Sequence, residues 1–251
     1  MSPWAALAIF AAGFAAGTIN VIVGSGSLVT FPTLLALGYP PLLANVSNNV
    51  GLVPGTVSGV LAYRPELVGQ RSRLLRLGTA SLLGGLAGAG LLLGLPGNVF
   101  RAAVPALILV ACILMALQPR LSRMLQEGDP KAHGGIGLFV GVFLTGVYGG
   151  YFGAAQGVIL IALLAIFVDD DLQRLNGTKN VLAMVVNTVA SVLFIIFSTL
   201  SWSVVGLIAA GSIIGGQVGA RIGRRLPAAV LRWVIVAVGL VVACILFAEW
   251  Y

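Results

Sequence analysis

Two glycine-rich stretches interrupt long apolar runs of this chain: Gly24-Ser25-Gly26-Ser27 and Gly149-Gly150-Tyr151-Phe152-Gly153. The apolar segments that follow them, residues 28–37 and 156–168, are shorter than the roughly 20 residues that a helix needs to cross a bilayer. Backbone that leaves the helical path at membrane depth is tolerated only where protein or a water-filled cavity satisfies its polar groups. The two stretches are therefore predicted to break two helices, and the short segments after them to be half-helices of re-entrant hairpins.

The composition predicts that the whole chain lies in the membrane. Of its 251 residues, 59% are hydrophobic and 8% are charged, and a soluble domain of this length could not bury so much apolar surface. The hydropathy pattern predicts apolar segments at 4–23, 28–37, 42–62, 74–95, 99–117, 136–152, 156–168, 179–199, 203–222 and 228–248. The fold class is thus an all-α polytopic membrane protein, with residues 1–251 forming a single transmembrane domain in the lipid bilayer.

The charges indicate topology. The net charge of +7 does not predict a nucleic-acid partner, because Lys and Arg gather in short connections between the apolar segments. The connections predicted to be cytoplasmic are 63–76, 118–135 and the one near 221, and those predicted to face outward, without Lys or Arg, are 38–41, 96–98 and 200–202. This alternation places both termini outside a plasma or inner cell membrane and the long 118–135 loop in the cytoplasm.

The same alternation predicts an inverted repeat. The first half, about 4–117, begins outside with a broken helix and hairpin and then crosses three times. The second half, about 136–251, makes the same passage from the inside, and 118–135 is the cytoplasmic linker. Asparagines recur at matching places after the two half-helices, where Asn45 corresponds to Asn176 and Asn49 to Asn180.

A series of short motifs follows the first break. Phe31-Pro32-Thr33-Leu34-Leu35 comes first, then Leu37-Gly38-Tyr39-Pro40-Pro41, and then a helix start with Ala, Asn and Ser residues; a related pattern recurs in the second half. Together these motifs resemble the TauE/SafE permease family, and the resemblance covers nearly the whole chain. It implies a membrane permease for small anions, notably sulfite and organosulfonates such as sulfoacetate. The run Asp169-Asp170-Asp171 has no counterpart that we can map to the family.

The two breaks are predicted to meet near the middle of the membrane and to bind the anion there. Each half-helix N-terminus presents free backbone N–H groups and the positive end of a helix dipole. Ser25 and Ser27 can cap the first half-helix, and Ala154, Ala155 and Gln156 take that place in the second. The alternative is that the glycines only permit close helix packing, which is also our interpretation of the glycines at 84–88 and 211–219.

Polar residues on the helices after the breaks extend this predicted site. Asn45, Asn48 and Asn49 share one helical face, as do Asn176, Lys179 and Asn180. The asparagines can either donate to oxyanion oxygens or bond neighbouring helices, and Lys179 can either attract the anion or extend to the cytoplasmic surface. The predicted substrate-binding residues are Gly24, Ser25, Gly26, Ser27, Asn45, Asn48, Asn49, Gly153, Ala154, Gln156, Asn176, Thr178, Lys179 and Asn180.

No acidic residue falls within a predicted span, and proton or sodium coupling usually relies on intramembrane carboxylates. The sequence therefore predicts an uncoupled carrier that exports its small anionic substrate by alternating access. No catalytic residue, cofactor or metal is expected, because the motifs of intramembrane enzymes and metal-ligand spacings are missing. An anion channel, a proton- or sodium-coupled transporter and a membrane scaffold remain as alternatives, and homo-oligomerisation is left open.

Overall fold

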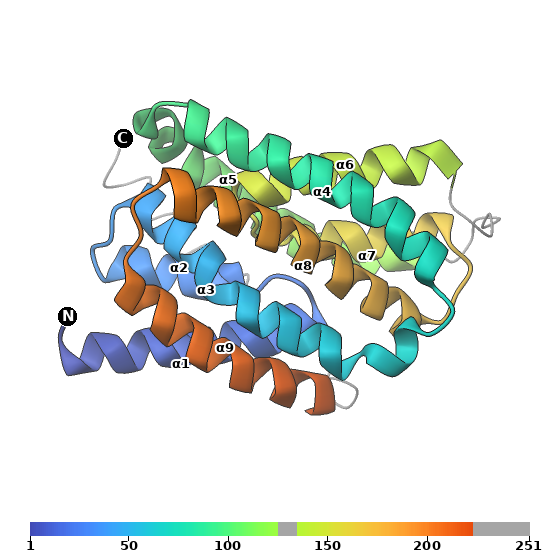
Figure 1. Ribbon diagram of the computed structural model, residues 1–251, viewed down its shortest axis with the longest axis horizontal. Helices are drawn as coiled ribbons and strands as arrows, with labels where there is room; N and C mark the ends of the chain where they lie inside the picture. The colour runs from blue at the N-terminus through green and yellow to red at the C-terminus, as the bar shows by residue number, and fades with distance from the viewer. Residues whose placement is uncertain (125–134, 223–251) are drawn as a thin grey trace.

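The computed structural model describes residues 1–124 and 135–222, and every regular element in these ranges is helical (Figure 1). The elements are α1 Pro3–Ile22, α2 Ser27–Ala36, α3 Pro41–Ala62, the 3-10 helix η1 Arg64–Leu67, α4 Arg71–Gly94, α5 Gly97–Met124, α6 Gly135–Tyr151, α7 Gln156–Phe167, α8 Leu172–Phe197 and α9 Trp202–Ile222. The predicted segment 228–248 and most of the linker lie outside the described residues. The chain is an all-helical polytopic membrane protein, as predicted.

Five of the described helices are long and apolar enough to cross a membrane: α1, α4, α5, α8 and α9. Helix α3 also has the length of a span, at 22 residues, but its asparagines and serines make it less apolar. The bounds agree with the predicted segments to within a few residues, except that α8 begins at Leu172 rather than at 179 and α5 ends at Met124 rather than at 117. The early start has a local cause, because the Asp171 side chain caps the helix by accepting a hydrogen bond from the Gln173 N–H over 2.8 Å.

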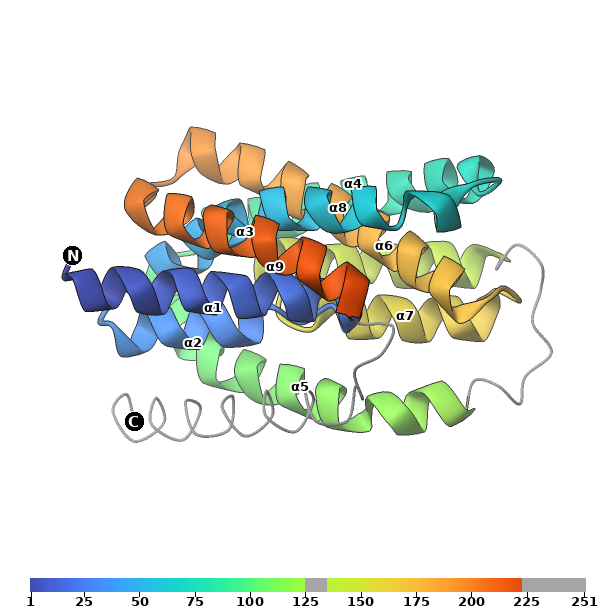
Figure 2. The ribbon, with the colours of Figure 1, turned by 90° about the horizontal axis from the view of Figure 1, so that it is seen from below.

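The breaks and the short helices after them are present. Helices α2 and α7 have 10 and 12 residues, and in Figure 2 the pair α1 and α2 lies mainly on the left of the molecule and the pair α6 and α7 on the right. The chain turns at each break through a glycine in the left-handed region, with φ of +85° at Gly24 and +80° at Gly153. Only glycine enters this region without strain, which explains why both breaks carry it.

Two tight helix pairs flank the breaks, because α1 packs against α9 and α4 packs against α6. A Cβ atom added to Gly88 would lie 2.0 Å from the carbonyl oxygen of Val147, and one added to Gly215 would lie 2.0 Å from that of Phe14. The helix backbones can approach so closely only where a side chain is missing, so the packing interpretation of the glycines at 84–88 and 211–219 is confirmed. The first helix of each half thus packs on a later helix of the other half.

Helices α3 and α8 lie side by side between these pairs, and they carry most of the buried polar residues. The connections α3–α4 and α7–α8 and the end of α5 lie at one end of the molecule, on the right in Figure 1, and the N-terminus lies at the other. We call the first end, which carries Arg64, Arg71, Arg73 and Arg174, the arginine-rich end. The connections α2–α3, α4–α5 and α8–α9 lie at the opposite end, as the charge pattern predicts.

Candidate functional site

The two breaks touch each other in the interior of the molecule. The Gly157 N–H donates to the carbonyl oxygen of Gly24 over 3.0 Å, and a Cβ atom on Gly24 would lie 2.5 Å from the Gly157 Cα. Beside this contact, Phe31 of α2 packs edge-on against Phe152 of the second break, with ring centroids 5.3 Å apart. Two glycines and two aromatic rings therefore join the halves where their broken helices end.

At the first break the predicted serine cap is wrong. Helix α2 begins after Gly26, and no side chain caps its N-terminus. The Ser25 hydroxyl turns away and donates to Met115 Sδ over 3.5 Å, while Ser27 is the first, half-buried residue of α2. The Gly26 N–H instead donates to Asn20 Oδ1 over 3.4 Å. Asn20 is thus a polar residue of this break that the sequence interpretation did not single out.

At the second break the start of α7 is fully buried. Ala154 and Ala155 are at most 1% exposed, and Ala155 has a φ of +60°, a conformation that a residue with a Cβ adopts only when its surroundings enforce it. Gln156 donates through Nε2 to Asn187 Oδ1 over 2.9 Å. Its own Oε1 is buried and has no hydrogen-bond partner among the described residues, so it is an acceptor without a donor in the interior.

The polar residues of α8 converge on the end of α1. Lys179 Nζ lies 3.2 Å from the Val21 carbonyl oxygen and 3.5 Å from that of Asn20. Asn176 Nδ2 and Asn180 Nδ2 donate to the same Val21 oxygen over 3.3 and 3.4 Å. Lys179 is 1% exposed, so the alternative in which it extends to the surface is wrong. The structure brings these three predicted residues together at the first break.

The asparagines of α3 are less concentrated. Asn45 Nδ2 donates to the Tyr151 carbonyl oxygen, at the end of α6, over 3.2 Å. Asn48 Oδ1 accepts from the Thr30 hydroxyl of α2, and Asn49 Oδ1 accepts from the Ser191 hydroxyl of α8 over 2.9 Å. All three side chains therefore form hydrogen bonds to neighbouring elements, which is the alternative in which the asparagines connect helices. Asn49 also lies near the second break, since its Nδ2 would be 3.9 Å from a Cβ on Gly153.

A small cavity lies next to the α1 end of the first break. It is lined by Asn20, Val21, Thr56, Asn180 and Ala183, and its volume is about 10 Å³. That volume holds about one water molecule and no sulfur oxyanion. An anion could therefore occupy this cavity only after the helices that line it move apart.

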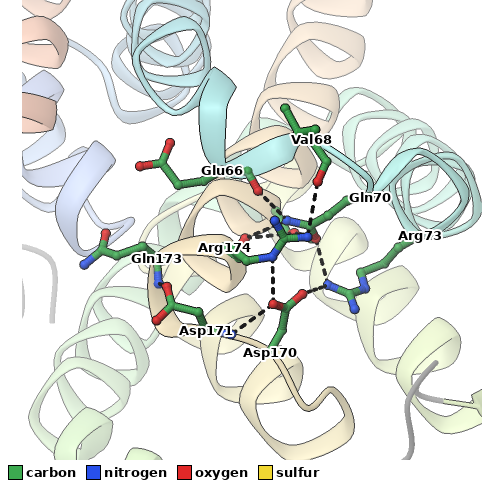
Figure 3. A network of polar contacts seen from close by, with 9 residues as sticks. Glu66, Val68, Gln70, Arg73, Asp170, Asp171, Gln173 and Arg174 are labelled. Atoms are coloured by element: carbon green, nitrogen blue, oxygen red, sulfur yellow. Dashed lines mark hydrogen bonds and ion pairs between the residues drawn. The ribbon is translucent and has the colours of Figure 1, made fainter.

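Thr178 does not reach the breaks; it bonds to Gln70, which belongs to a polar network at the arginine-rich end (Figure 3). Its hydroxyl donates to Gln70 Oε1 over 2.8 Å, and the same oxygen accepts from Arg73 over 2.7 Å. Arg73 and Arg174 both bind the Asp170 carboxylate, over 2.6 and 2.7 Å. These contacts tie the start of α4 to the α7–α8 connection. The spacing of Asp170 and Arg174, four residues apart, was the signal in the sequence that could have identified one of the two ion pairs.

The electrostatics of this network follow from its hydrogen bonds. Burial by itself would raise the pKa of the Asp170 carboxyl, but hydrogen bonds from Arg73, the Asp171 backbone and Arg174 outweigh that effect and hold the pKa below its ordinary value. The carboxylate is therefore ionised at neutral pH. This accounts for one member of the aspartate run, and the helix cap accounts for Asp171.

Comparisons with known proteins agree with the sequence resemblance. The family model described as "Sulfite exporter TauE/SafE" matches residues 9–246. A "Probable membrane transporter protein ORF9" of Sinorhizobium sp is 27% identical over 245 residues, which are 96% of this chain and 92% of that protein. A "Probable membrane transporter protein" of Haemophilus influenzae is 30% identical over 217 residues, covering 85% and 83%. "Probable membrane transporter protein YfcA" of Escherichia coli K12 is 24% identical over 223 residues, covering 88% and 82%.

Proposed function

The chain belongs to the TauE/SafE sulfite exporter family, and from this premise we propose that it exports a small sulfur oxyanion across the cell inner membrane. It is a multi-pass membrane transporter, as its relatives are named. The proposed substrate is sulfite or an organosulfonate such as sulfoacetate. The family's description as a sulfite exporter supports both the sulfur oxyanion and the outward direction.

The observation that carries the proposal is the contact between Gly24 and Gly157. It brings the positive N-terminal end of α7 against the turn that precedes α2, and backbone N–H groups at helix N-termini are suited to bind an oxyanion once they are released from such contacts. Asn49 and Asn180, one from each half, lie beside the two breaks and can add amide donors. Broken helices that meet at membrane depth are the arrangement in which many transporters hold their substrates.

The proposed mechanism is alternating access around this fixed site. The exchanged packing of α1 with α9 and of α6 with α4 supports an inverted repeat, in which one half moves against the other. The cavity of about 10 Å³ then belongs to a closed state between the outward-open and inward-open ones. The positive-inside rule orients the arginine-rich end toward the cytoplasm, which puts the N-terminus outside.

The proposed driving force is the membrane potential. No aspartate or glutamate is buried in the described spans, so these spans offer no carboxylate for proton or sodium coupling. An inside-negative potential drives an anion outward with about 2.3 kcal/mol per charge per 100 mV. We therefore propose uncoupled export.

Uptake of labelled sulfite and sulfoacetate into proteoliposomes tests the proposal, with a potential imposed and no proton or sodium gradient. Saturable flux that follows the potential is the expected result. Flux that appears only with a proton or sodium gradient would replace uniport by coupled transport, and flux that never saturates would indicate a channel. Absence of flux for every sulfur oxyanion would contradict the substrate and favour a scaffold role.

Two matched variants test the proposed asparagine ligands. Asn49→Ala and Asn180→Ala each remove one amide donor beside a break, and loss of a hydrogen bond to a charged ligand weakens binding about tenfold or more. The measurement is the sulfite concentration at half-maximal flux for variants with a wild-type elution profile. Unchanged values in folded protein would show that these asparagines only connect helices.

A further inference from the structure

Lys179 is the one lysine, arginine, aspartate or glutamate that is fully buried among the described residues. Its side chain is 1% exposed, and no aspartate, glutamate or arginine in the described ranges is buried. Ionisable groups at membrane depth are rare and mark ion or substrate pathways. The position of this lysine beside the breaks therefore bears on the charge of what the site accepts.

The protein provides only part of the compensation for this charge. The ammonium donates to the carbonyl oxygens of Asn20 and Val21. An ammonium has three hydrogens, and the third finds no acceptor in the described part of the chain. Both ion pairs among the described residues are made by Asp170 at the arginine-rich end, and neither involves Lys179. One N–H donor is thus left for a ligand, and no acidic side chain in the described ranges is placed to neutralise the ammonium.

The partial charges of the helix ends at the breaks cancel one another. The C-terminal ends of α1 and α6 each contribute about −0.5 charge, and the N-terminal ends of α2 and α7 each contribute about +0.5. Because Gly24, which follows α1, and Gly157, at the start of α7, are in hydrogen-bond contact, the breaks hold helix ends of both signs close together. Their partial charges sum to about zero there, so the Lys179 ammonium alone sets the net charge.

The other half adds no second cation. The residue that corresponds to Lys179 is Asn48, whose neutral amide accepts from Thr30. Arg73 and Arg174 lie at the arginine-rich end with side chains 19% and 35% exposed, both bound to Asp170, and water screens charges in such positions. The charge at the breaks is therefore about +1.

We propose that this site selects singly charged sulfur oxyanions: hydrogen sulfite over the sulfite dianion, and monosulfonates over sulfonates that carry a second charge, such as sulfoacetate. The inference rests on the proposed function and specifies its substrate class. A monoanion neutralises the Lys179 charge. A dianion leaves one negative charge without a partner in a medium of low dielectric constant, which is strongly unfavourable.

Competition against labelled sulfite in proteoliposomes of the full-length protein tests this at one pH. Methanesulfonate and sulfate are tetrahedral sulfur oxyanions of similar size that carry one and two charges. Methanesulfonate is expected to inhibit at a concentration at least about tenfold lower than sulfate. Isethionate, which carries one charge, is likewise expected to inhibit at a lower concentration than sulfoacetate, which carries two. Equal inhibition by both charge classes, stronger inhibition by the dianions, or inhibition by neither would overturn the inference while sulfite flux keeps the proposed function. Absence of sulfite flux would instead refute the proposed function, and the inference with it.

Variants separate the charge of Lys179 from its role as a hydrogen-bond donor. Lys179→Gln keeps a donor for the Val21 carbonyl oxygen but removes the charge, so the ratio of the two inhibitory concentrations is expected to fall toward one. Lys179→Arg keeps the charge and is expected to keep the ratio. A purely structural lysine would leave the ratio unchanged in both. Should Lys179→Gln fail to fold, Asn180→Asp cancels the charge from the adjacent position, and it is expected to weaken methanesulfonate inhibition at least about tenfold.

Discussion

The two breaks are built alike, but the helices beside them support them differently. At the first break, α8 directs Asn176, Lys179 and Asn180 to the carbonyl oxygens at the end of α1. At the second break, α3 directs only Asn45 to the end of α6, and the position that corresponds to Lys179 is the neutral Asn48. A pair of related halves can thus share a backbone path while one of them alone carries the charge. In the proposed site, the two breaks then determine where the anion lies, and the side chains of α8 determine which anion binds.

The largest expected effect comes from the contact that both breaks share. Gly157→Ala places a Cβ atom 2.5 Å from the Gly24 Cα, which is too close for the two breaks to stay in contact. Forcing the breaks apart is expected to lower stability by about 1–3 kcal/mol and to abolish sulfite transport. The measurement is the melting temperature in detergent together with flux. Gly90→Ala is the matched control, since a Cβ at that exposed glycine of α4 meets nothing within 4 Å, and a wild-type melting temperature for Gly157→Ala would show that the contact is not tight.

The next largest effect is expected from moving the positive charge from Lys179 to the corresponding position, Asn48. Lys179→Asn makes the first break as neutral as the second and is expected to lower sulfite uptake at least about tenfold. Adding Asn48→Lys to that variant returns a cation to the site from the other half and is expected to restore part of the rate. The initial rate of uptake is measured for both proteins at equal reconstituted amounts. If the double variant folds and is no faster than the single one, the position of the cation matters and not only its charge.

A smaller effect on stability should distinguish Asn45 and Asn176, the two asparagines at matching positions after the half-helices. In the described residues Asn45 is the one side chain that bonds the Tyr151 carbonyl oxygen, so Asn45→Ala leaves a buried acceptor unpaired and is expected to lower stability by about 1–3 kcal/mol. Asn176→Ala leaves Val21 with Lys179 and Asn180 as donors, and a loss of about 1 kcal/mol or less is expected. Thermal unfolding of both variants measures the difference. Equal losses of stability would mean that the two asparagines contribute equally to holding the helix ends at the two breaks.

The smallest expected effect concerns the two ends of the molecule. The arginine-rich end is tied by the Asp170 ion pairs, whereas at the opposite end the Ser201 N–H donates to Ser47 Oγ over 3.0 Å. Because the folded-state pKa of Asp170 is lowered, its contribution is present at neutral pH and is lost as the pH falls through that lowered value. Asp170→Asn is expected to lower stability by about 1 kcal/mol or less at pH 7, and the difference from the wild type should vanish in acid. Ser47→Ala is the control, with a loss that does not change with pH.

Most of the helical framework could be predicted from the sequence, because apolar length and glycine-rich interruptions are local properties. The start of α8 could not, since polar residues such as Arg174 made its first turns look like a connection. The hydrogen-bond partners of the polar side chains could not be predicted from the sequence either. Ser25 binds Met115 instead of a helix end, and Lys179 binds the end of α1 instead of reaching water, because which carbonyl or sulfur lies nearby depends on packing between distant segments. Asp170 was set aside for the same reason: one of its partners, Arg73, is far away in the chain.

In the proposed mechanism, the hydrogen bond from Gly157 to Gly24 occupies a backbone N–H group that the substrate would use. An anion that takes the Gly157 N–H must first displace a carbonyl oxygen, so its apparent affinity is reduced by the fraction of molecules in which that bond is closed. The same bond protects the empty carrier, because a pore cannot open through the breaks while it persists. Weak binding and a low leak are then two results of one peptide-to-peptide contact.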